Sequence, residues 1–228
     1  MIPHLSWLLE DLEDHCQSKL WLIDSIEFYL GIYNCHYFPR QAYAGVQMFF
    51  TGSENCYIPD LPTSIYGQNL VITSGDFQVL HCGGFNNTNY LRSCLSLDVT
   101  AKKWVPHSHL TKYRYAATSV TMPNGVYILG GEDSPTTTDF LPKSSQEWTQ
   151  GPLIPDDGLH QGCSVRISDT EFVLIGGYHT WDRVVKFNIE SSEWIPMPNL
   201  KIGRRHHGCA MIGKNIIVTG LYDDKEFV

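Results

Sequence analysis

The sequence of 228 residues predicts an all-β fold made of repeated four-stranded antiparallel sheets. The first observation is a series of apolar runs that end in glycine, three of them in a glycine doublet: Gly83 and Gly84, Gly130 and Gly131, Gly176 and Gly177, and the single Gly220. The first glycines lie at positions 83, 130, 176 and 220, so the intervals are 47, 46 and 44 residues. The second observation is a tryptophan after each doublet, spaced 44 and 46 residues apart: Trp104, Trp148 and Trp194. Two independent markers therefore share one period.

Each repeat also has the internal order of an antiparallel meander. A tight turn precedes each glycine strand, at residues 74–76, 123–125, 168–170 and 213–215. A second polar turn precedes each tryptophan strand, at residues 98–103, 143–147 and 188–193. A connector that contains proline follows each tryptophan, at residues 105–106, 151–155 and 195–198. Four strands in about 45 residues cannot bury both faces of a sheet alone, so the units must stack, and radial stacking gives a β-propeller.

Arg114 and Arg204 add a third marker, because each stands sixteen residues before a first glycine. The glycine doublets, tryptophans and arginines together resemble kelch repeats over residues 57–220. The resemblance implies a propeller of about four kelch blades, as a closed ring or an open arc, with a scaffold or adaptor function. The first unit has no arginine, His160 takes the arginine position of the third unit, and Leu221 replaces the second glycine of the fourth.

The two ends are less regular, and we divide the chain into residues 1–43 and an incomplete propeller at 44–228. Leucines and isoleucines at helical spacing in residues 1–43 predict a short helical segment, too short for the BTB domain often joined to kelch repeats. Residues 46–56 repeat the seven-residue spacing of an outer strand, from Phe49 to Cys56. If that strand completes the last unit, the ring closes. Otherwise the chain is an open arc or a fragment of a larger propeller.

The net charge and the cysteines limit the class of partner and the cellular compartment that we expect. With 16 Lys and Arg against 24 Asp and Glu, the formal net charge is −8, which argues against nucleic acid as a partner. No apolar run is long enough to span a membrane, and no signal peptide is evident, so we expect no membrane and a cytoplasmic protein with free thiols. An oxidising compartment, reached if the N-terminus is incomplete, would instead allow a bridge between Cys82 and Cys94. The glycosylation sequon at residues 86–88 favours that alternative.

The sequence offers no catalytic motif. Nucleotide-binding glycine loops, zinc spacing and the Asp-box of sialidase-like propellers are all absent. Residues 204–209 (RRHHGC) form a dense polar cluster, for which a structural role, anion binding and metal binding are alternatives. A copper oxidase on a kelch-like propeller would need several imidazoles and a Tyr-Cys pair at the axis, which the spacing does not establish. We therefore predict no catalytic residue, no metal and no cofactor.

The remaining candidates are loops that open on one face of the predicted propeller. Aromatic and arginine side chains in such loops are typical of binding surfaces. The predicted contact residues are Tyr90, Arg92, Tyr178, Trp181, Arg183 and Arg205. The sequence thus predicts a non-catalytic module that binds a protein partner. The alternatives are a propeller-fold oxidase or carbohydrate-active enzyme, and a truncated kelch product without independent function.

Overall fold

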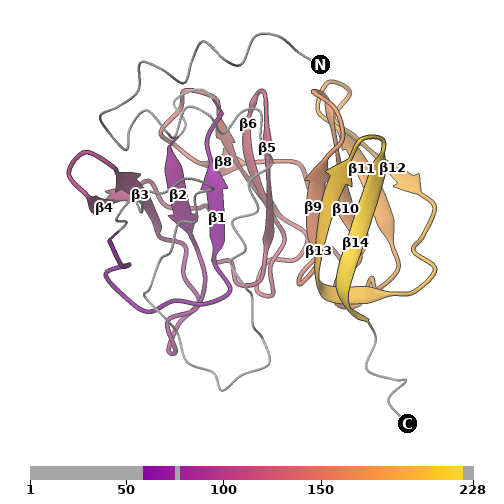
Figure 1. Ribbon diagram of the computed structural model, residues 1–228, viewed down its shortest axis with the longest axis horizontal. Coiled ribbons are helices and arrows are strands. Elements are labelled where there is room, and N and C mark those ends of the chain that lie inside the picture. The colour runs from indigo at the N-terminus through magenta and orange to yellow at the C-terminus, as the bar shows by residue number, and fades with distance from the viewer. Residues whose placement is uncertain (1–58, 75–77, 223–228) are drawn as a thin grey trace, which may run out of the picture.

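A computed structural model of the chain describes residues 59–74 and 78–222. This part folds into fourteen strands and contains no helix. The strands form three four-stranded antiparallel sheets and one two-stranded sheet, each made of consecutive strands. In Figure 1 the three four-stranded sheets follow one another in chain order along the long axis, and the two-stranded sheet overlaps the last of them in this view. The predicted all-β architecture with repeated four-stranded units is therefore confirmed.

We call the three complete sheets blades 1 to 3 and the two-stranded sheet the half blade. Blade 1 contains β1 (Asn69–Ile72), β2 (Val79–Cys82), β3 (Cys94–Asp98) and β4 (Lys103–His107). Blade 2 contains β5 (Thr118–Met122), β6 (Gly125–Leu129), β7 (Thr138–Pro142) and β8 (Thr149–Gln150). Blade 3 contains β9 (Cys163–Arg166), β10 (Glu171–Ile175), β11 (Val184–Asn188) and β12 (Glu193–Met197). The half blade contains β13 (Arg204–Ile212) and β14 (Asn215–Tyr222). The predicted helical segment at residues 1–43 and the predicted outer strand at 46–56 lie outside the described residues.

Two of the three repeat tryptophans, Trp104 and Trp194, connect the outer strand of a blade to the chain segment before that blade, whereas the indole N–H of Trp148 is buried without a hydrogen-bond partner among the described residues. Trp104 lies directly opposite Leu97 in the β3–β4 hairpin, and Trp194 lies opposite Phe187 in the β11–β12 hairpin. The indole N–H of Trp104 donates to the carbonyl of Pro59 at 2.9 Å, and that of Trp194 donates to the carbonyl of Leu153 at 2.7 Å. The seven-residue spacing in the sequence is therefore the spacing of a cross-strand pair.

The hydrophobic core lies between the sheets. One apolar cluster joins blades 1 and 2, a second joins blades 2 and 3, and a third joins blade 3 to the half blade. Each cluster contains fully buried side chains of central strands, such as Leu80, Ile128 and Phe172. Burial of one such side chain stabilises the fold by roughly 1.5–3 kcal/mol. Stacking is thus what allows four strands of this length to be stable.

A line of backbone hydrogen bonds links the four sheets where each chain segment enters its first strand. Ala116 donates its N–H to the carbonyl of Gly67 at 2.9 Å, Gln161 donates to Ala116 at 2.9 Å, and His206 donates to Gln161 at 2.7 Å. All four residues have positive φ, between 48° and 64°. The same local backbone conformation therefore recurs once per sheet and presents a donor to one neighbour and an acceptor to the next.

The glycine doublets make a second set of contacts between sheets. The N–H of the second glycine donates to a carbonyl of the following sheet: Gly84 to Arg114 at 2.7 Å, Gly131 to Leu159 at 2.9 Å, and Gly177 to Arg204 at 2.8 Å. Leu159, not His160, is therefore the structural counterpart of the two arginines, and the prediction for His160 is wrong. The physical reason is one extra residue in blade 3. Fifteen positions separate Gln161 from Gly176, but fourteen separate Ala116 from Gly130.

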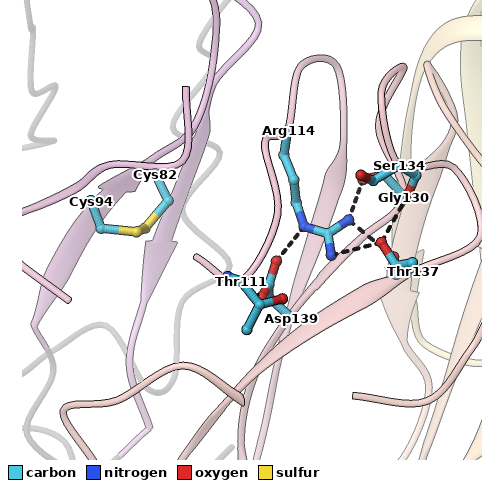
Figure 2. A network of polar contacts seen from close by, with 8 residues as sticks. All are labelled: Cys82, Cys94, Thr111, Arg114, Gly130, Ser134, Thr137 and Asp139. Carbon is cyan, nitrogen blue, oxygen red and sulfur yellow. Dashed lines mark hydrogen bonds and ion pairs between the residues drawn. A yellow bond between two sulfur atoms is a disulfide. The ribbon is translucent and has the colours of Figure 1, made fainter. Parts of the chain in front are cut away.

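Arg114 holds the centre of a buried polar network in blade 2, shown in Figure 2. Its Nε contacts a carboxylate oxygen of Asp139 at 2.5 Å, and both side chains are fully buried. The guanidinium also donates to the carbonyls of Gly130 at 2.5 Å and Thr137 at 3.0 Å. The second oxygen of Asp139 accepts the backbone N–H of Thr111 at 2.7 Å. The charged pair is thus compensated within the blade and fixes the connection that enters β5.

Two disulfides correct the expectation of free thiols. Cys82 and Cys94 lie opposite each other in β2 and β3 and are bonded, as Figure 2 shows. Cys163 of β9 and Cys209 of β13 are also bonded, across the interface between blade 3 and the half blade. The free-thiol prediction is therefore wrong for all four cysteines of the described part, and the cytoplasmic expectation loses that support. No helix among the described residues has the length and apolar character needed to cross a membrane.

Because two histidines are buried, we expect the free energy of unfolding to fall in mild acid. Burial lowers the pKa of His81 and of His207 to about 4, from an ordinary value of 6.5. Between pH 4 and pH 6.5 the unfolded chain binds more protons than the folded one. The stability that each neutral buried histidine contributes is therefore complete above pH 6.5 and is lost as the pH falls toward 4. At pH 5 the loss is roughly 2 kcal/mol for each histidine. The ion pair of Glu171 with Lys186 lowers the pKa of the Glu171 carboxyl below its ordinary 4.5. Acid therefore breaks this ion pair only at a lower pH than the range in which the two histidines act.

Urea unfolding at pH 7 and pH 5 measures this effect. The variant His81→Leu is expected to lose about half of the difference in unfolding free energy between the two pH values. If the double variant His81→Leu with His207→Leu loses as much unfolding free energy between pH 7 and pH 5 as the native chain, the two histidines are not the cause.

Candidate interaction surface

One face of the blades carries the loops with most sequence freedom. The connection after each glycine doublet and the connection from one sheet to the next open on this side, which we call the glycine face. The opposite side holds short hairpin turns, such as the turn between Met122 and Gly125 and the turn between Ile212 and Asn215. The glycine face is therefore where side chains can vary without interrupting a hairpin.

Equivalent positions of successive sheets form a crown on the glycine face. One set directly precedes the residues of the backbone hydrogen-bond line: Tyr66, Tyr115, His160 and Arg205. The second set directly follows the glycine doublets: Phe85, Glu132 and Tyr178. Within each blade the second-set N–H donates to the first-set carbonyl at 2.9 Å. The backbone thus fixes these seven side chains in a repeated arrangement. The crown is this set together with Tyr90 and Trp181, which pack against it.

The crown is cationic and aromatic where blade 3 meets the half blade. The guanidinium carbon of Arg205 lies 5.2 Å from the ring centre of Tyr178 and 5.1 Å from that of Trp181. The ring of His160 packs 5.0 Å from Tyr178 and 5.9 Å from His179. Burial lowers the pKa of His160, and the nearby His179 and Arg205 lower it further. The ring centres of Tyr178 and Trp181 are themselves 5.8 Å apart, so Arg205 places its cation over a pair of contacting aromatic rings of the neighbouring blade.

The other half of the crown is aromatic and acidic. Tyr90 stacks on Tyr115, with ring centres 5.6 Å apart and planes 11° apart. Phe85 packs 5.3 Å from Tyr90, and Tyr66 packs 5.7 Å from Tyr115. Burial raises the pKa of Tyr90, and the charge and hydrogen bond of Glu132 raise it further. The rings fill the space between them, so this half is a closed aromatic cluster with a carboxylate at its border.

The structure places the six predicted contact residues in four surroundings. It brings together Tyr178, Trp181 and Arg205, and it places Tyr90 in the aromatic half. Arg92 lies apart from both, with its guanidinium 5.9 Å from the ring of Tyr113.

Arg183 points back into the connection between blades 2 and 3. It donates to the carbonyls of Pro155 at 3.0 Å and Gly158 at 2.9 Å and pairs with Asp156 at 2.8 Å. Its side chain is only 17% exposed. These contacts give Arg183 a role in holding the connector.

The six predicted contact residues do not include Tyr66, Tyr115 and His160, which hold equivalent positions in successive blades. The signal was the common place of all three before the first strand of a blade. Within residues 59–74 and 78–222, no three His, Cys, Asp or Glu side chains come together as metal ligands. His81 and His207 are buried inside different sheets, apart from His160.

Comparisons with known proteins agree with this architecture. No family model matches the chain. "Kelch repeat protein C2" of Vaccinia virus (strain Western Reserve) is 24% identical over 153 residues, which is 61% of this chain and 28% of the relative. The protein of the same name from Cowpox virus is 24% identical over 135 residues, covering 55% of this chain and 25% of the relative. The chain thus spans about a quarter of the length of the curated relatives it matches.

A solved structure of another protein, YjhT, supports the fold. It superposes on this chain with a TM-score of 0.63 and 12% identity, covering 71% of this chain and 60% of that one. At this identity the similarity concerns the fold alone.

Proposed function

We propose that this kelch-repeat protein is a non-catalytic scaffold, which binds a protein partner through the crown where blade 3 meets the half blade. Two findings support the proposal: the similarity to kelch repeat proteins of poxviruses and the arrangement of the glycine face. The described residues group no set of side chains that would hold a metal, and we propose that the chain needs no cofactor. The net charge of −8 supports a protein partner over nucleic acid.

The observation that carries the proposal is the position of the Arg205 guanidinium over the adjacent rings of Tyr178 and Trp181. The arginine comes from β13, and both rings come from the loop between β10 and β11. Arginine, tyrosine and tryptophan dominate the energetics of protein interfaces. A side chain already held against two rings loses little conformational freedom when a partner binds. This group is therefore the expected centre of the interface, with Tyr90 and Arg92 at its edge and Arg183 outside it.

Trp181→Ala is expected to weaken partner binding at least tenfold, which corresponds to about 1.4 kcal/mol. The substitution removes one ring beside Arg205 but keeps the backbone carbonyl that accepts the Arg204 N–H at 2.8 Å. Affinity capture with the full folded chain, followed by quantitative identification of the bound proteins, measures the effect. Thermal unfolding of the same variant checks that the fold is retained.

Lys103→Ala is the matched control, because Lys103 is exposed at a hairpin turn on the opposite side. Proteins captured by the native chain and by Lys103→Ala, but lost with Trp181→Ala, would support the crown as the binding surface. Capture that depends on Lys103 and not on Trp181 would place the interface on the other face.

Three alternatives have distinct experimental outcomes. A propeller-fold oxidase would require a bound metal, and elemental analysis of the purified chain would reveal it. A carbohydrate-active enzyme would turn over a glycan substrate without a protein partner. A truncated kelch product without independent function would fail to unfold cooperatively as an isolated chain.

A further inference from the structure

The two disulfides differ in their surroundings. Cys82 and Cys94 are 0% and 1% exposed and connect neighbouring strands of one blade. Cys163 is 7% exposed, whereas Cys209 is only partly buried. Their bond connects two sheets over a sequence separation of 46, which is one repeat. Thiol–disulfide exchange requires access to a sulfur atom, so the second bond, with one partly buried cysteine, is the more accessible of the two.

The half blade has fewer attachments than a complete blade. The described structure gives it two strands, and β13 packs on β9 through the apolar side chains of the third cluster. Hydrogen bonds to blade 3 come from one end of β13, through the backbones of Arg204 and His206. The opposite side of the half blade leaves Ile212 56% exposed and Ile217 47% exposed. The disulfide at Cys209 is thus the one covalent cross-link between the half blade and the rest of the described chain.

We propose that the Cys163–Cys209 disulfide is a redox-sensitive fastening of the half blade, which opens under reducing conditions that leave Cys82–Cys94 intact. β13 also carries Arg205, four residues before Cys209. Reduction therefore loosens the strand that places Arg205 over Tyr178 and Trp181. This last consequence rests on the proposed function, whereas the selective opening does not.

A small thiol such as glutathione is the reductant in this exchange. Its thiolate attacks the sulfur of Cys209, the less buried cysteine of the pair, the sulfur–sulfur bond breaks, and the Cys163 sulfur leaves as a thiolate that takes up a proton. A second thiol then attacks the mixed disulfide and releases Cys209. Two electrons pass from two small thiols to the protein, and the products are one small disulfide and two protein thiols. A small disulfide reverses both steps.

Graded reduction of the full chain tests the proposal. The protein is equilibrated in glutathione buffers of increasing reducing power, its thiols are alkylated, and each cysteine is followed by peptide mass analysis. Replacement of Cys16, Cys35 and Cys56 by serine removes the competing thiols. Cys163 and Cys209 are expected to be alkylated together, in buffers where Cys82 and Cys94 remain protected.

Hydrogen exchange of the same samples reports on the half blade without any partner. Amides of β13 and β14 are expected to exchange at least about tenfold faster after reduction, whereas those of β6 stay unchanged. A variant with Cys163→Ala and Cys209→Ala should show the fast exchange in every buffer. The matched control, Cys82→Ala with Cys94→Ala, should keep the redox response of the half blade.

Reduction of both disulfides in the same buffer, or of Cys82–Cys94 first, would overturn the proposal. So would exchange in β13 and β14 that is the same before and after reduction. Partner capture separates this result from the proposed function. If hydrogen exchange in β13 and β14 becomes faster after reduction, but partner capture does not depend on Trp181, the redox-sensitive disulfide is supported and the crown is rejected as the interface.

Discussion

Arg114→Ala is expected to lower the free energy of unfolding by about 3–5 kcal/mol, because it leaves the carboxylate of Asp139 buried without its counter-ion. The carbonyl of Gly130 also loses a donor in a buried position. Urea unfolding at pH 7 measures the difference. Arg166→Ala is the matched control, because its ion pair with Asp169 is exposed, and its loss should cost at most about 1 kcal/mol.

Blade 3 shows how the same position can be apolar. Leu159 replaces Arg114 there, and Val185 stands in β11 at the place of Asp139 in β7. The double variant Arg114→Leu with Asp139→Val should therefore recover more than half of the loss caused by Arg114→Ala. Full recovery is not expected, because in blade 3 the hydroxyl of Thr180 donates to the carbonyl of Gly176, and blade 2 would lack such a donor. If the double variant is less stable than Arg114→Ala, the ion pair of Arg114 with Asp139 stabilises the fold by more than neutralising two buried charges.

Gly130→Ala is expected to cost about 4 kcal/mol or more. The φ of Gly130 is 68°, and the left-handed conformation alone disfavours alanine by about 1–2 kcal/mol. A Cβ would also lie 1.8 Å from the Leu159 carbonyl oxygen, an overlap that only a shift of blade 3 can relieve. Overpacking of this kind costs about 3 kcal/mol, at times more.

Gly213→Ala separates the two contributions. Gly213 has a similar φ of 61°, but a Cβ there would meet no atom within 4 Å. Its expected cost is therefore the conformational part alone, about 1–2 kcal/mol. Equal destabilisation by the two substitutions, measured by urea unfolding, would mean that the doublet does not set the distance between blades 2 and 3.

The repeat period and the strand order could be predicted from the sequence, because both depend on local chemistry. The glycine doublets, the turns and the cross-strand distance from Phe187 to Trp194 are all properties of one hairpin. The counterpart of Arg114 in blade 3 could not be found by counting back from Gly176. One extra residue in that blade shifts the count, and only the hydrogen bond from Gly131 to Leu159 restores the register.

The candidate site was predictable in part for the same reason. Placement on the glycine face follows from the topology of a four-stranded meander, so Tyr178, Trp181 and Arg205 were found. The direction of Arg183 was not predictable, because it depends on the carbonyls of a connector 25 or more positions earlier. The bridge between Cys163 and Cys209 did have a signal, since its separation of 46 residues equals one repeat. Equivalent positions of adjacent blades lie side by side, and two cysteines one period apart should be examined as a pair.

The line of backbone hydrogen bonds has a consequence for how such a surface diversifies. Its four positions hold glycine, alanine, glutamine and histidine, because the bonds use only main-chain atoms. The preceding crown positions hold tyrosine, tyrosine, histidine and arginine on the same main-chain frame. Substitutions at the crown can therefore change the chemistry of this face while the main-chain attachment of one blade to the next stays intact. Each blade can thus vary its crown residue independently, and residues at these positions can be exchanged between blades as separate units.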